Sequence, residues 1–214
     1  MQTPEELSRE LAKSTAYHEA GHAVIAVTQN LPLCEAGMHV DSKGNGVTFT
    51  LRRNPGDQNN ARADIEERER SIIMIYAGNI AQEKFSPCSR WEGSLGDDTI
   101  AEALLSEMYS PPKGAEWCRT QQRLWGESYK LVYGHWKAIE ALAEALWAKP
   151  MVPRVDLGPL SFHSQDLLEK WMTGYEVKAL LEPFSVFASV VADSEGVGTL
   201  RLFFSVPGWG CSPV

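Results

Sequence analysis

The sequence predicts a mainly α-helical fold with a small β element and a β-hairpin close to the end of the chain. Helical spacing of apolar residues and helix-capping signals organise most of the chain up to about residue 174, whereas β-rich runs are confined to residues 37–53 and 184–206. The 214 residues are 43% hydrophobic and 22% charged, which is an ordinary globular composition and enough chain for a buried core. We therefore expect one domain over residues 1–174, followed by a tail over residues 175–214.

Five helices are expected along the chain. The first has Thr3 as its N-cap and Pro4 as its first helical residue, and it should continue to about Asn30 with a break near Ser14. The other four are expected over residues 61–85, 97–109 and 115–148, and in the segment SQDLLEKWM, which begins at Ser164 as its cap.

Two regions are predicted to contain strands. Residues 37–53, GMHVDSKGNGVTFTLRR, offer two short strands around a Gly/Asn turn, and GVTFTL is the better of the two. Near the end of the chain, two β-rich runs flank the turn sequence DSEG, a pattern typical of a hairpin. The strand GVTFTL should present an edge, formed by Gly46, Val47, Thr48 and Phe49, along which an extended substrate could pair.

Charge and composition exclude several function classes. A formal charge of −8 and a pI near 5.2 argue against nucleic acid or an anionic membrane as the main partner. The sequence has no run of 18 apolar residues, so we expect no membrane insertion, and its first residues lack the apolar core of a signal peptide. The four cysteines are scattered without a CxxC pair, which indicates reduced thiols and a cytoplasmic location.

The segment TAYHEAGHAV, residues 15–24, carries the pattern HExxH. On a helix, His18 and His22 lie one turn apart and can reach one metal ion, while Glu19 lies roughly 100° from His18 and beside that ion. A general base that takes a proton from water needs this position. The opposite face would pack into the core through Ala16, Ala20, Ala23, Val24 and Val27. The alternative is a chance pair of histidines, which a third ligand would argue against.

Asp97 is the expected third ligand. Measured around the helix that it begins, its direction coincides with an apolar face formed by Ile100, Ala101, Leu104, Leu105 and Met108. Asp98 points roughly 100° away and should be more exposed. The alternative role for Asp97 is that of a simple helix cap.

Glu83 is a further candidate, because it shares a face of the second long helix with Ile65, Ile72 and Tyr76. It could orient a ligand histidine or serve as the third ligand itself. The alternative is a glutamate at a helix end whose carboxylate reaches water.

These residues resemble the peptidase domain of FtsH-type zinc metalloproteases. TAYHEAGHAV is similar to that family's zinc-binding helix, and GNGVTFTL is similar to its Gly-x-Thr strand. Two later segments resemble the family's GGRAAEE segment and its third-ligand segment with the following helix, matching at Gly78, Ala81, Glu83, Gly93, Asp97, Ile100, Ala101, Leu104 and Met108. The resemblance covers about residues 14–172 and implies an FtsH-peptidase-like helical domain in which Asp97 is the third zinc ligand.

The sequence departs from the family in three respects. It contains no GxxxxGK[ST] nucleotide loop and no transmembrane segment, Gly96 stands where the family often has Asn, and residues 110–120 and the tail after about Gly174 have no counterpart. The resemblance therefore implies peptide-bond hydrolysis at zinc without an ATPase motor in the same chain.

Together these observations predict a zinc metalloendopeptidase with one Zn²⁺ per chain, bound by His18, His22 and Asp97, and with Glu19 as the general base. Its expected partners are unfolded or flexible polypeptides, delivered with or without a separate ATPase or adaptor. One rival is a catalytically silent zinc-binding or peptide-binding module of the same fold. The other is a structural helical protein with a chance HExxH sequence.

Overall fold

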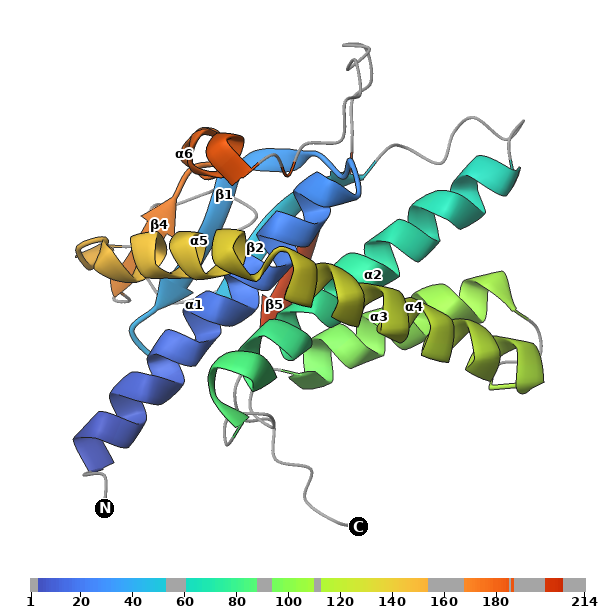
Figure 1. Cartoon of the computed structure of the whole chain (residues 1–214), viewed down its shortest axis with the longest axis horizontal. Helices are drawn as coiled ribbons and strands as arrows, with labels where there is room; N and C mark the ends of the chain where they lie inside the picture. The colour runs from blue at the N-terminus through green and yellow to red at the C-terminus, as the bar shows by residue number, and fades with distance from the viewer. Residues whose placement is uncertain are drawn as a thin grey trace.

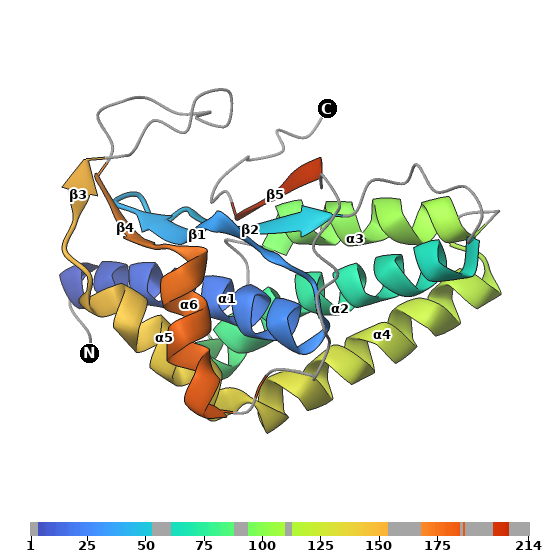
Figure 2. The same cartoon turned by 90° about the horizontal axis from the view of Figure 1, so that it is seen from above.

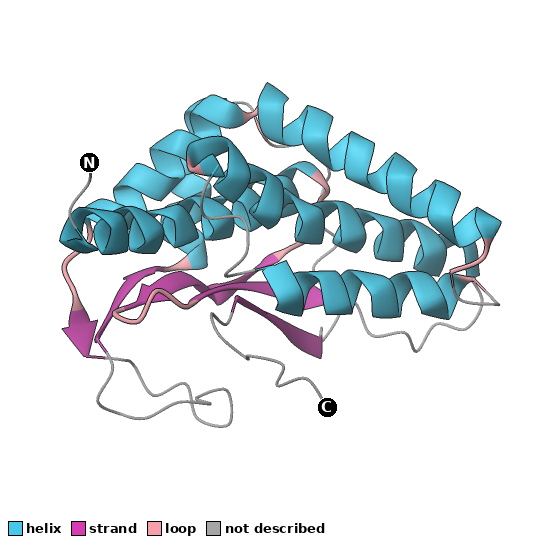
Figure 3. Cartoon of the chain, turned by 90° about the horizontal axis from the view of Figure 1, so that it is seen from below, coloured by secondary structure: helices cyan, strands magenta, loops and turns pink. Residues whose placement is uncertain are grey.

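Helices make up most of the described chain and lie on one side of a small antiparallel sheet (Figures 1 and 3). The computed structural model describes residues 4–52, 61–87, 94–109, 113–153, 168–184, 186 and 199–205. A mainly helical fold with a small β element is therefore confirmed.

The sheet has five strands in the order β3-β4-β1-β2-β5, and all neighbours are antiparallel. Its centre is the predicted hairpin of β1, Leu33–Asp41, and β2, Gly46–Arg52. The outer strands are β3, Val152–Pro153, and β4, Leu168–Met172, on one side, and β5, Thr199–Ser205, on the other. Strand β5 therefore lies beside β2, although about 150 residues separate them in the chain (Figure 2).

The core forms where α1, Pro4–Thr28, crosses α2, Ala61–Phe85. The two backbones approach closely at Gly21, where an added Cβ atom would lie only 2.6 Å from the carbonyl oxygen of Ala77. Fully buried apolar side chains from both helices fill the contact, among them Ala20, Val24, Ile25, Ile72 and Ile75. This close packing brings the face of α1 that carries HEAGH directly against α2.

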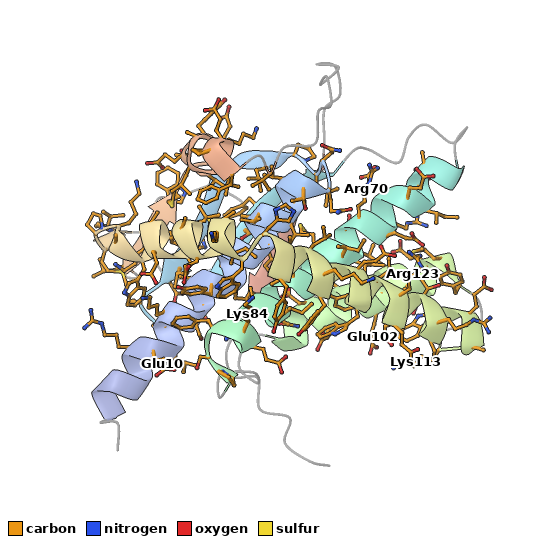
Figure 4. All side chains as sticks on the ribbon, viewed as in Figure 1. Glu10, Arg70, Lys84, Glu102, Lys113 and Arg123 are labelled. Carbon is orange, nitrogen blue, oxygen red and sulfur yellow. The ribbon has the colours of Figure 1, made fainter. Side chains whose placement is uncertain are left out.

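Three more helices complete the helical layer: α3, Ser94–Met108, α4, Ala115–Gly134, and α5, Trp136–Ala148. The Ser128 hydroxyl on α4 donates to the carbonyl of Ile73 on α2, at 2.8 Å, and Arg123 on α4 binds Glu69 on α2 at the exposed side of the same contact (Figure 4). These contacts hold α4 against α2, and the buried face of α5 packs against α1.

The first, second and third predicted helices are confirmed, although α1 continues through Ser14 without a break and α3 begins three residues before Asp97. The single helix expected over 115–148 is wrong. It divides at His135, whose φ of −104° and ψ of 18° leave the helical region, and a new helix starts at Trp136.

The short helix predicted from Ser164 is also wrong where it is described. Residues 168–172 form strand β4, which pairs with β1 through partners such as Trp171 and His39. Pairing with a distant strand overrides the local helical pattern of this segment, as tertiary contacts often do for short elements. Residues 164–167 lie outside the described part of the chain.

The tail packs onto the preceding residues. Helix α6, Gly174–Leu181, begins with a capping box made by Thr173 and Glu176, and it buries Val177 and Leu181. Most of the first arm of the expected C-terminal hairpin lies outside the described residues, and the described partner of β5 is β2. The open edge expected at Gly46–Phe49 is therefore not free, because β1 and β5 pair with the two sides of β2.

Among the described residues, none of the helices combines the length and apolar character needed to cross a membrane.

Candidate metal centre

Helix α1 presents His18 and His22 on one face, towards α2 and α3. The two imidazole rings are 4.6 Å apart between centroids, and both side chains are buried. Opposite them on α2 lies Gly78, where an added Cβ atom would come within 2.4 Å of the His22 ring and 2.7 Å of the His18 ring. A glycine at this position is therefore what allows α2 to pack over the two histidines.

Asp97 reaches the same point from the first turn of α3. Its Oδ2 atom lies 2.8 Å from the Nε2 atom of His18 and 3.0 Å from that of His22, and the two Nε2 atoms are 2.9 Å apart. Within the described residues, these three form the group of side chains that could hold a metal ion. The helical phase of Asp97 is confirmed by the burial of Ala101, Leu104 and Leu105 on its face.

The hydrogen bonds behind the histidines determine which nitrogen faces the centre. The Nδ1 atom of His22 donates to the carbonyl of Met74, at 2.9 Å, and a carbonyl can only accept. The Nδ1 atom of His18 lies 2.9 Å from Oε1 of Gln82, whose amide nitrogen in turn donates to the Ser14 hydroxyl at 3.2 Å. With this amide orientation both Nδ1 atoms carry the proton, so neutral imidazoles direct an Nε2 lone pair inward.

Two nitrogen lone pairs and a carboxylate oxygen thus converge within 3.0 Å of one another in a buried space. Three acceptors repel one another unless a cation lies among them, either a metal ion or a proton. In addition, the second carboxylate oxygen of Asp97, Oδ1, is buried and accepts no hydrogen bond from the described part of the chain. The arrangement therefore has the chemistry of a cation site with two nitrogen donors and one oxygen donor.

The pKa values of Asp97 and His22 are shifted because these side chains lie so close together. Burial alone would raise the pKa of Asp97, but attraction and hydrogen bonds from His22 and His18 outweigh it and lower that pKa to about 2. Burial would lower the pKa of His22, but the charge and hydrogen bond of Asp97 raise it to about 9. Without a metal, the centre therefore holds a proton on His22 in place of the cation.

Glu19 lies beside this centre and is completely buried. Its Oε2 atom accepts a hydrogen bond of 2.6 Å from the hydroxyl of Thr48 on β2, and Gly46 leaves room for Oε1, which would lie only 2.4 Å from an added Cβ atom there. Burial raises the pKa of Glu19, against the opposing effects of His18, His22 and Thr48. Strand β2 thus holds the carboxylate in place, a role that its local sequence does not reveal.

The competing acidic residues lie elsewhere. Asp98 is exposed, and its Oδ1 atom accepts a hydrogen bond of 3.3 Å from Asn79. Hydrogen bonding to Tyr129 raises the pKa of Tyr133, and the nearby charge of Glu83 adds to the rise, which places Glu83 close to α4. The side chain that orients His18 belongs to its neighbour Gln82, whose Oε1 atom lies 2.9 Å from Nδ1 of His18.

Gln82 could have been found from helix phase. It follows Gly78 by four residues on α2, and Ser14 precedes His18 by four residues on α1, so both lie one turn from residues of the centre. No protein-family model matches the chain, and a comparison with curated proteins finds no match. The resemblance to FtsH-type peptidases therefore rests on the residues themselves.

Proposed function

We propose that this protein is a zinc-dependent metallopeptidase whose metal ligands are His18, His22 and Asp97 and whose general base is Glu19. The observation that carries the proposal is the convergence of three buried lone pairs with a glutamate beside them. A structural pair of histidines needs neither the third acceptor nor a nearby carboxylate whose pKa is raised by burial.

The donor set fits zinc better than other common ions. Two imidazole nitrogens and one carboxylate oxygen are typical of catalytic zinc sites, which have three protein ligands and leave one position for water or substrate. Magnesium and calcium prefer sites made of oxygen atoms alone. The hydrogen bonds from Nδ1 of His18 and His22 are the outer partners that such ligands usually have.

The chain's own residues have separate tasks in the proposed reaction. When bound, zinc would supply Lewis-acid chemistry, which makes water more acidic and polarises a peptide carbonyl. Glu19 accepts the proton of the attacking water and later delivers it to the nitrogen of the leaving amine. Thr48 donates to Oε2 of Glu19 and thereby directs its other oxygen, Oε1, into the space that Gly46 leaves open.

A catalytically silent metal-binding module is the second candidate. The burial of His18, Glu19, His22 and Asp97 favours it, because none of the four is accessible to a polypeptide in this state of the molecule. The two functions share the same metal ligands and differ in whether a peptide can reach Glu19.

Metal analysis combined with a hydrolysis assay tests the proposal. Purified protein, dialysed and then loaded with zinc, should retain about one ion per chain and should cleave casein or a reduced, denatured protein. A chelator should stop the cleavage, and zinc should restore it, whereas ATP should change nothing. Stoichiometric zinc without cleavage of any denatured protein or peptide would favour the silent module, and absence of bound zinc would reject both candidates.

A further inference from the structure

The metal centre is closed in this structure. His18, Glu19 and Asp97 are 0% exposed and His22 is 1% exposed, so no peptide bond can reach them without a movement of the covering elements. A peptidase that cleaves polypeptides must open such a site, so one of the covering elements has to move.

The position of strand β5 indicates that it is the element that moves (Figures 1 and 2). It pairs with β2 along its full length, so that Ser205 lies opposite Gly46 and Phe203 lies opposite Thr48. Those two β2 residues are the ones that touch the carboxylate of Glu19. Paired strands lie about 4.8 Å apart, which places the β5 backbone immediately beside the catalytic part of β2.

The other side of β5 leads to the metal ligand on α3. This helix carries Asp97 in its first turn, and β5 packs against it. The strand therefore lies between the two elements that an extended polypeptide would have to contact, namely the edge of β2 and the helix of the third ligand.

We infer that β5 is an intramolecular occupant of the peptide-binding edge of β2, and that an extended polypeptide must displace it to be cleaved. This inference rests on the proposed peptidase function. The backbone hydrogen bonds that β5 makes with β2 are the ones that an added substrate strand would make. Its sequence, TLRLFFS, is rich in residues that favour the extended conformation.

Because β5 is part of the same chain as β2, it competes strongly with a free polypeptide for the edge of β2. Their pairing is intramolecular, and an intramolecular competitor can have an effective concentration on the order of 1 mM. A free polypeptide at a much lower concentration competes poorly against it. Cleavage by the unmodified protein should therefore be slow and should increase when the pairing of β5 with β2 is weakened.

A reversible cross-link tests the inference in the full chain. Leu51 and Leu200 are Cα partners in β2 and β5, and the Cα atoms of antiparallel partners are about 4.5–5.5 Å apart, which is within the range of a disulfide. The double variant Leu51→Cys/Leu200→Cys would be made after replacing the native cysteines by serine at Cys34, Cys88, Cys118 and Cys211. Oxidation should lower the rate of casein cleavage at least about tenfold, and reduction should restore it.

The control is a second cross-link at the far edge of the same sheet. Pro153 and Leu168 are Cα partners in β3 and β4, which are separated from β2 by β1. Oxidised Pro153→Cys/Leu168→Cys should cleave casein as fast as its reduced form. A loss of activity in both cross-linked proteins would mean that rigidity of the sheet, not the position of β5, limits the reaction.

Weakening the pairing of β5 with β2 should have the opposite effect to the cross-link and should raise the rate of casein cleavage. Leu202→Pro fixes φ at about −65°, whereas an antiparallel strand holds φ at about −140°, so it should weaken the pairing of β5 with β2. We expect casein cleavage to rise at least about tenfold, and a free TLRLFFS peptide should inhibit this variant. Hydrogen exchange of the zinc-free protein should be faster at the backbone amides of β2, a measurement that does not depend on activity.

The outcomes separate this inference from the proposed function. If zinc-dependent cleavage persists unchanged in the oxidised β2–β5 form and in Leu202→Pro, the inference is overturned and the peptidase function stands. If Leu202→Pro shows faster hydrogen exchange in β2 but neither it nor any other variant cleaves a substrate, both the inference about β5 and the proposed peptidase function are overturned.

Discussion

Within the described part of the chain, two buried clusters combine histidine with carboxylate, and the one on α1 has the properties of a metal centre. In the sheet, His39 on β1 lies 3.4 Å from Glu169 on β4, and both are buried. The neighbouring carboxylate of Asp41 accepts hydrogen bonds from the backbone of Lys43 and Asn45, and so serves the turn. This pair brings together one histidine and one carboxylate, and no third ligand group joins it among the described residues.

The centre on α1 differs from the His39–Glu169 pair in the number of its acceptor atoms and in the direction of its histidine lone pairs. Three acceptor atoms from two helices meet within 3.0 Å, and both histidines already use their Nδ1 protons elsewhere. Burial beside a carboxylate is therefore not sufficient to identify a ligand histidine. The informative observation is the direction of the remaining lone pair, which the hydrogen bonds behind the ring determine.

Among substitutions that distinguish the two clusters, the loss of a histidine should have the largest effect on bound zinc. His22→Ala should reduce bound zinc from about one ion per chain to nearly none and abolish hydrolysis, because two ligands remain. His39→Ala should keep the zinc, because its ring lies outside the centre. Elemental analysis of both dialysed proteins measures this, and loss of zinc from His39→Ala alone would reverse our assignment.

Exchanging the glutamates separates catalysis from metal binding. Glu19→Gln should keep zinc but lower the rate of peptide hydrolysis about 10²–10⁴-fold, because the amide retains the shape of the side chain but cannot accept a proton. Glu169→Gln should leave the rate at the wild-type level. If Glu19→Gln loses the metal, Glu19 would have to be a ligand.

The adjacent aspartates test the third ligand. Asp97→Asn should weaken zinc binding more than about 100-fold, which exceeds the usual effect of losing an outer partner. Asp98→Asn should bind zinc nearly normally, because the Asp98 side chain is exposed and bonded to Asn79. Competition with a zinc chelator measures both affinities. Equal losses in the two variants would contradict the geometry of α3.

Substitutions at the adjacent residues Gln82 and Glu83 test which side chain orients His18. Gln82→Leu removes the acceptor of the His18 Nδ1 proton and should weaken zinc binding about 10–100-fold. Glu83→Gln, one position along the same helix, should change the affinity little. The same chelator competition provides the measurement, and a larger effect at Glu83 would return it to the role first considered for it.

The smallest effect is a dependence of stability on pH in the zinc-free protein. Folding raises the pKa of His22 from 6.5 to about 9, so its proton stabilises the fold fully below pH 6.5, and this stabilisation is lost as the pH rises through 9. The free energy of unfolding should therefore fall over this interval. Zinc displaces that proton, so the stabilisation by zinc should grow with pH instead. Urea unfolding with and without zinc measures both slopes, and equal slopes would contradict a shared position for proton and metal.

Local sequence patterns predicted the parts of the centre that depend on helix phase. The i,i+4 spacing of His18 and His22, the apolar face behind Asp97 and the bounds of α2 all follow from a period of 3.6 residues. A helix contains its own hydrogen bonds and can therefore be identified from its own residues.

Features that depend on distant partners were missed. The bond from Thr48 to Glu19, the strand β4 and the pairing of β5 with β2 all join segments far apart in the chain. No periodicity within β2 reveals that a strand from the tail lies beside it. Pairing of this kind is decided by the whole fold, which is why the expected open edge at Gly46–Phe49 is occupied.

X-ray absorption at the zinc edge can determine whether His18, His22 and Asp97 hold the metal. Zinc-loaded protein should show only nitrogen and oxygen neighbours at about 2.0–2.2 Å, with the outer scattering of two imidazole rings, and Asp97→Asn should lose one short oxygen contact. Sulfur scattering at about 2.3 Å, or a spectrum with fewer than two imidazoles, would exclude this set of ligands.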